Sequence, residues 1–186
     1  MSMTQHAQPL KSDSLHRQLD DLVAFLDNSL RRNDPLHAME RGIWAQLLRL
    51  GHQLVAHVFE TCGPGDQGES LTLPDGREAQ RLEALHHRRY VSIFGAFDLE
   101  RTAYGSREGQ KIDFVPLDNR LQLPQSDFSY VLQDWDQALA AEQAFGQVNA
   151  TIERMLELKQ SVASLEHMNQ DMAQQATPFE ITQVSQ

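Results

Sequence analysis

The feature that most constrains this chain is a pair of leucine-rich helical patterns within residues 14–62. In each pattern, apolar residues recur at steps of three and four, which places them along one side of an α-helix. Asp34-Pro35 separates the two patterns, because aspartate caps a helix well and proline suits its first position. We therefore predict an antiparallel helical hairpin over residues 14–62, after a disordered start over residues 1–13. The apolar stripes are Leu15, Leu19, Leu22, Val23, Leu26 and Leu30, then Leu36, Met39, Ile43, Leu47, Leu50, Leu54 and Val58.

Neither predicted helix can hide its stripe alone, so the stripes must pack together or against a partner. Beyond them, glycine, proline and aspartate dominate the stretch GPGDQGESLTLPDG, which predicts a loop. Residues 77–87 fit either a short basic helix or irregular chain. Together these segments form a predicted loop and basic connector over residues 63–88.

The stretch RYVSIFGAFDLERTAYG differs from its surroundings, because aromatic and β-branched residues alternate with polar ones. This alternation predicts strands over residues 90–94 and 97–104, joined by a turn at Gly95-Ala96. Residues 111–115 fit a third strand. We predict one small antiparallel three-stranded sheet over residues 89–124.

Three further helical patterns follow in residues 125–176, with a short connection over residues 157–160 and Ser161 as a cap. This arrangement predicts a three-helix bundle resembling a helix-turn-helix, followed by a tail over residues 177–186. The predicted fold class is α+β and mostly helical. The three stripes are Phe128, Val131, Leu132, Trp135 and Leu139; Phe145, Val148, Ile152, Met155 and Leu156; and Val162, Leu165, Met168 and Met172.

Charge limits the surface that could bind DNA. The net charge is −10, but it is spread unevenly along the chain. Residues 1–76 contain 6 Lys and Arg and 10 Asp and Glu, and residues 121–186 contain 2 Lys and Arg and 9 Asp and Glu. Residues 77–120 contain 8 Lys and Arg and 7 Asp and Glu. Because neutralising phosphates supplies most non-specific affinity for DNA, a wide binding face should be basic. Only residues 77–120 could provide such a basic face, and their basic residues are interspersed with acidic ones.

No motif of an enzyme or a metal site is present in the sequence. Glycine-rich phosphate loops and nucleophile elbows are missing, and His52 and His57 are five residues apart, on different helix faces. Acid pairs such as Asp134 with Asp136 are expected on solvated helix faces. Cys62 is the single cysteine, which excludes disulfide frameworks. We predict no catalytic residue, no metal site, no membrane span and a cytoplasmic location.

The third helix of the predicted bundle could enter a DNA major groove. Its outward residues Gln160, Ser164, His167 and Gln170 are types that can contact base edges. The helix itself contains no Lys or Arg, and Lys159 stands at its start. A helical packing layer explains the pattern equally well.

The order of motifs from residue 90 to residue 179 resembles the N-terminal region of bacterial insertion-sequence transposases of the ISKra type. In that family, a phenylalanine-glycine turn precedes a proline-leucine-aspartate segment, and a helical bundle follows. The matching residues here are Phe94-Gly95, Arg101, Tyr104, Pro116-Leu117-Asp118, Phe145, Leu156, Leu158 and Ser161.

The resemblance implies a DNA transposase whose three catalytic acids hold two Mg²⁺ ions in an RNase H-like domain. The family's first catalytic aspartate lies on a strand ending Asp-Gly after the helical region. This sequence contains neither that strand nor the paired cysteines that some relatives carry after the tyrosine. We therefore expect a non-catalytic N-terminal part, either of a truncated or frameshifted element or taken as a domain from a longer protein, without activity by itself and without a cofactor of its own.

Such a part would position the protein on the inverted repeats of a mobile element, assemble subunits into a homo-oligomer, or do both. An alternative from another class is an acidic helical module for protein–protein interaction or oligomerisation, without DNA binding. The candidate DNA contacts are Arg88, Arg89, Arg101, Lys159, Ser164 and His167.

Overall fold

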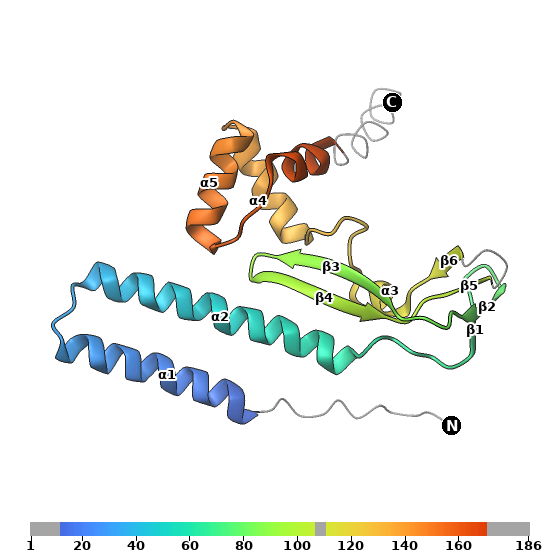
Figure 1. Cartoon of the computed structure of the whole chain (residues 1–186), viewed down its shortest axis with the longest axis horizontal. Coiled ribbons are helices and arrows are strands. Elements are labelled where there is room, and N and C mark those ends of the chain that lie inside the picture. Colours follow the sequence, from blue (N-terminus) through green and yellow to red (C-terminus); the bar gives the residue numbers. More distant parts are fainter. Residues whose placement is uncertain (1–11, 107–110, 171–186) are drawn as a thin grey trace, which may run out of the picture. The chain divides into compact units, whose positions relative to one another are not determined.

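The computed structural model describes residues 12–106 and 111–170, which confirm a mostly helical α+β chain. These residues form two compact units (Figure 1). The first unit takes its residues from Met1–His87 and Leu99–Leu117, and the second from Arg88–Asp98 and Asp118–Gln186. Each unit is described by itself below.

The first unit begins with the predicted helical hairpin, formed by α1 (Ser12–Arg31) and α2 (Leu36–Cys62), which lie side by side (Figure 1). The helices approach closely where Phe25 faces Gly42, because a Cβ at Gly42 would overlap the Phe25 ring. The predicted cap differs from the observed one. Pro35 occupies the N-cap position of α2 without a side-chain cap, and the Asp34 carboxylate instead binds Arg32 at 2.6 Å.

The same unit holds a four-stranded antiparallel sheet in the order β1-β2-β5-β6. Its strands are β1 (Ser70–Thr72), β2 (Glu78–Arg81), β5 (Tyr104–Ser106) and β6 (Lys111–Phe114). The prediction of a loop and connector over residues 63–88 is therefore wrong, because this segment contains β1, β2 and the start of β3. Leu73 and Ala79 are buried beside Tyr104, which gives these short strands a core.

A separate two-stranded sheet pairs β3 (His86–Ser92) with β4 (Gly95–Arg101). Gly95 has φ of 117°, a conformation that favours glycine, and the turn lies near the predicted place. The prediction of a single three-stranded sheet is wrong, because the predicted strand over residues 97–104 divides into β4 and β5, which lie in different sheets. Between β4 and β5, the backbone N–H of Thr102 donates a hydrogen bond to the Pro64 carbonyl, and the Ala103 carbonyl accepts one from the Leu82 N–H.

The helices near the end of the chain are α3 (Pro116–Leu121), α4 (Tyr130–Ala140), α5 (Phe145–Leu156) and a final helix over residues 162–170. The last three confirm the predicted helical patterns. Ser129 caps α4 by accepting a bond from the Leu132 N–H, and Ser161 caps the final helix as predicted. The second unit's buried apolar residues include Leu132, Val148, Ile152, Leu156, Leu158, Leu165 and Met168.

Part of the predicted stripes is not in the core of this unit. Val131, Met155 and Val162 are between 43% and 50% exposed, and Met172 lies outside the described residues. Backbone bonds from Val91 N–H to Asp127 and from Ser129 N–H to Val91 join β3 to the segment before α4. These bonds fix where α4 begins.

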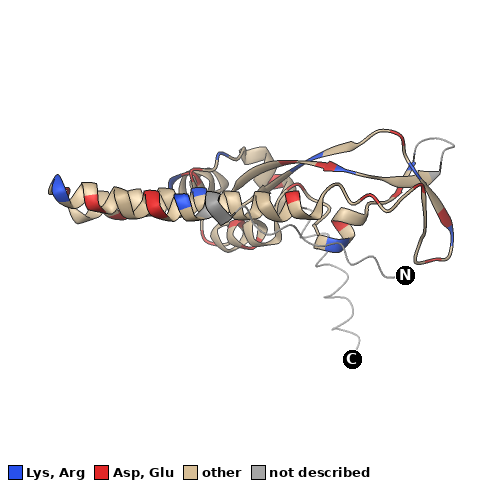
Figure 2. Cartoon of the chain, turned by 90° about the horizontal axis from the view of Figure 1, so that it is seen from below, with Lys and Arg blue, Asp and Glu red and all other residues tan. Residues whose placement is uncertain are grey.

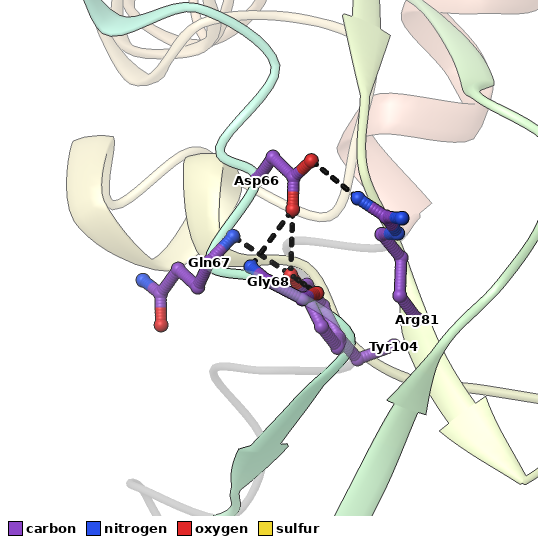
Figure 3. Close-up of polar contacts among 5 residues, drawn as sticks. All are labelled: Asp66, Gln67, Gly68, Arg81 and Tyr104. Atoms are coloured by element: carbon purple, nitrogen blue, oxygen red, sulfur yellow. Dashed lines mark hydrogen bonds and ion pairs between the residues drawn. The ribbon is translucent and has the colours of Figure 1, made fainter.

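The buried side chain of Tyr104 connects the loop around Gly68 to the sheet in the first unit (Figure 3). Tyr104 is fully buried, and its hydroxyl accepts a bond from the Gln67 N–H at 2.7 Å and lies 2.9 Å from the Gly68 carbonyl. Asp66 accepts a bond from the Gly68 N–H and pairs with Arg81 at 2.6 Å. The Gly68 N–H, followed by Arg81, lowers the pKa of the Asp66 carboxyl. Residues of the predicted loop are thereby held against β2 and β5.

We predict that Tyr104→Phe lowers the free energy of unfolding by about 1–2 kcal/mol, because the Gln67 N–H and the Gly68 carbonyl lose the hydroxyl of this buried side chain as a partner. Urea denaturation followed by circular dichroism measures this change. Tyr130→Phe is the matched control, because Tyr130 is 63% exposed. Equal effects of the two substitutions would contradict the role given to the Tyr104 hydroxyl.

Candidate functional site

Lys and Arg are interspersed with Asp and Glu along the ribbon in Figure 2. This agrees with the alternation of charges in residues 77–120. Binding to DNA would therefore depend on a few individual side chains, and the six predicted contacts have to be considered one by one.

Arg88, the first predicted DNA contact, is a structural anchor of the second unit. Its side chain is only 9% exposed, and its guanidinium pairs with Asp118 at 3.0 Å. The same group donates hydrogen bonds to the carbonyl oxygens of Pro124 and Ser126. Because this guanidinium is buried and bonded on several sides, it is not available to a phosphate. The prediction of Arg88 as a DNA contact is therefore withdrawn.

The other predicted contacts lie on several elements. Arg89 is exposed on β3, and Arg101 is half-buried at the end of β4, in the other unit. Lys159 is 85% exposed and lies 3.7 Å from Glu153. Ser164 and His167 are on the final helix, where the Ser164 hydroxyl is bonded to that of Ser161. Lys159, Ser164 and His167 thus share one segment, and these five residues remain predictions.

An apolar surface lies on the helical hairpin. Eight large apolar side chains of α1 and α2 are between 42% and 69% exposed. Together they present roughly 700 Å² of apolar surface, more than the few hundred Å² common on a monomer. We call this set the hairpin face. Its members are Leu19, Val23 and Leu30 of α1 and Leu36, Trp44, Leu47, Leu54 and Val58 of α2.

The helical period places the hairpin face on one side of the hairpin. At about 100° per residue, the centre of the face lies about two fifths of a turn from Phe25 in α1 and about two fifths of a turn from Gly42 in α2. Phe25 and Gly42 mark the contact between the helices. Both rotations have the same sense, and the helices run in opposite directions. The two stripes therefore point to the same side.

Sequence reasoning found the leucines of this face but omitted Trp44. The helical pattern gives Ile43 the place in the stripe, and Trp44 is the next residue along the chain. Among the described residues of α1 and α2, Met39 is the one large apolar side chain that is buried. The two stripes therefore pack together only in part. The exposed residues of the hairpin face are available to pack against a partner.

A polar cleft of about 400 Å³ lies beside the Tyr104 contacts in the first unit. Asp66, Glu69, Arg81, Glu83 and Thr102 are among the residues that line it. Arg81 is paired with Asp66, and these side chains do not include the hydrogen-bonded nucleophile and base that covalent catalysis needs. Within residues 12–106 and 111–170, no three His, Cys, Asp or Glu side chains gather as metal ligands would.

An acidic side chain is buried in the second unit. Asp136 on α4 is fully buried, whereas the neighbouring Asp134 is exposed. Burial raises the pKa of the Asp136 carboxyl to about 6, against a smaller lowering by the nearby Gln160 side chain. The expectation that both acids are solvated is therefore wrong for Asp136. Its position four residues after the buried Leu132 was the available signal, since that step stays on one helix face.

We predict that Arg88→Ala lowers the free energy of unfolding by roughly 3–5 kcal/mol, because it leaves Asp118 and two carbonyl oxygens without the buried cation. Arg89→Ala is the matched control, because the adjacent side chain is exposed. Chemical denaturation of both variants measures the difference. A loss as large in Arg89→Ala, or none in Arg88→Ala, would contradict the anchoring role.

We predict that Asp136→Asn stabilises the protein above pH 6. Because the folded pKa lies above the usual value of 3.8, the folded state binds the proton more tightly. Stability therefore falls as pH rises from about 4 to about 6, and stays lower by roughly 2–3 kcal/mol above that window. Asp136→Asn should recover this loss at pH 8 and change little at pH 4, in thermal or urea unfolding. Asp134→Asn is the control, and equal behaviour of both variants would refute the assignment.

No helix among the described residues combines the length and apolar character that crossing a bilayer requires. A comparison with protein-family models, with curated proteins and with solved structures finds no match for this chain. Function is therefore inferred from the residues themselves and from their surroundings.

Proposed function

We propose that this chain is the N-terminal region of a DNA transposase, where it serves subunit assembly and positioning on DNA ends. The proposal is supported by the places that the resembling residues occupy. Gly95 follows the β3–β4 turn with positive φ, and Tyr104 is the buried residue that holds the loop around Gly68. Leu117, Leu156 and Leu158 are buried. Residues in such positions constrain a fold, so their shared order is more informative than shared surface residues would be.

The assembly part of this role is carried by the hairpin face. Its apolar side chains are exposed within one chain, and burying them would stabilise a complex by the hydrophobic effect. Fewer residues are left to bind DNA, because the Arg88 guanidinium is paired with Asp118. Arg89 and Lys159 are the exposed cations that remain among the predicted contacts.

A second candidate is an acidic interaction module that does not bind DNA. The excess of negative charge in residues 121–186 favours this candidate. This region, which includes the final helix, contains 9 Asp and Glu but 2 Lys and Arg. Such a charge would repel the phosphates that a groove-binding helix must approach.

An electrophoretic mobility shift assay at low salt separates the two candidates. The probe is a duplex that carries the terminal inverted repeat of the mobile element, and a scrambled duplex of the same length is the competitor. The transposase proposal predicts a shift that the scrambled duplex does not compete away. The double substitution Arg89→Ala with Lys159→Ala should weaken it several-fold, since each lost phosphate contact reduces affinity.

Arg77→Ala is the matched control in this assay, because Arg77 is exposed and already paired with Asp75. It should leave the shift unchanged. A shift that the scrambled duplex abolishes equally, or no shift at all, would remove the DNA-end role and favour the second candidate.

A further inference from the structure

We infer that a second copy of this chain docks on the hairpin face, so that two hairpins form a four-helix core in which α1 of each chain packs on α2 of the other. The inference names the partner for the assembly role proposed above and rests on it. Three observations support it: the area of the face, the small core inside one hairpin, and the distribution of charge.

The area of the hairpin face fits a stable dimer. Its eight side chains expose roughly 700 Å² of apolar surface, and a standard interface buries about 800 Å² per partner. The face is also long and narrow, because it follows helices of 20 and 27 residues. A second hairpin offers a surface of the same length and the same residue types.

One hairpin has a small core of its own, in which Leu22, Phe25, Leu26, Ile43 and Leu50 are half-buried. Met39 is buried, whereas Leu47, Leu54 and Val58 are more than 40% exposed within the described part of α2. Helices of this kind reach a closed core when four of them surround it, with the apolar stripe of each helix turned inward. Two hairpins that meet through the face described above supply those four helices.

Charge selects which helices meet. The sequence of α1 contains four Asp and two Arg, whereas α2 contains two Glu and two Arg together with three His. Contact of α1 with α1 of the other copy would bring acidic helices together. Contact of α1 with α2 of the other copy avoids this repulsion, and a two-fold axis then produces the same contact twice.

Light scattering coupled to size-exclusion chromatography of the full chain tests the dimer. The expected mass is about twice 21.1 kDa at micromolar concentration, with little dependence on salt. A mass of one chain throughout the concentration range overturns the inference, whatever else covers the hairpin face.

Two sets of substitutions test the arrangement. Leu19→Lys with Val23→Lys charges the face on α1, and Leu47→Glu with Leu54→Glu charges it on α2. Both pairs should give monomers with an unchanged helical circular dichroism spectrum, because these side chains are already at least 42% exposed in one chain. Gln53→Glu on another side of α2 and Val131→Glu on α4 are the controls, and both should remain dimers.

Mixing the two charged variants then distinguishes the pairing. If α1 packs on the other copy's α2, the mixture regains a dimer, because one contact becomes Lys against Glu and the other is unaltered. A mixture that stays monomeric overturns this pairing, and variants that stay dimeric alone overturn the hairpin face as the interface.

The outcome is separate from that of the DNA assay. A monomer that shifts the inverted repeat would refute the dimer and leave the transposase proposal standing. A dimer that binds no DNA would support the hairpin interface and remove the DNA-end role.

Discussion

Burial of apolar surface on the helical hairpin is the constraint on which the rest of this account depends. Two helices in contact can each cover about one side of the other, and α1 and α2 carry more apolar surface than that contact hides. Phe25 lies against Gly42, while leucines on another side of both helices remain exposed. Because exposed apolar area of this size is costly in water, the hairpin is explained best as half of a larger core.

Buried polar residues give each unit a fixed geometry, and this explains why some residues that look functional in the sequence are structural. Arg88 holds Asp118 and two carbonyl oxygens, and Tyr104 holds the loop around Gly68. A polar group can be buried at low cost only if its bonds are satisfied. Tyr104 and Asp118, the partner of Arg88, both lie in the segment that the proposed relation to transposases rests on, and both serve the framework of the fold.

The helices could be predicted from the sequence because helical periodicity is local, and the stripes through Leu19, Leu54 and Ile152 specify their helices without knowledge of the fold. The four-stranded sheet could not, because pairs such as Gln80 with Gly105 join residues far apart in the chain. For the candidate site, the exposure of Arg89 fits its sequence context, whereas the burial of Arg88 depends on Asp118, thirty residues away. Asp136 was misjudged for a similar reason: its burial depends on the other helices around α4.

The central claim is that the hairpin face is covered by a second copy, and the fluorescence of Trp44 tests it most directly. Trp44 belongs to the face and is 47% exposed in one chain. In a Trp135→Phe background, where Trp44 is the remaining tryptophan, its emission can be followed through a dilution series. The account predicts blue-shifted emission at high concentration and a shift to the red as the dimer dissociates. Emission that stays the same at every concentration, in a sample that light scattering shows to be monomeric, would contradict it.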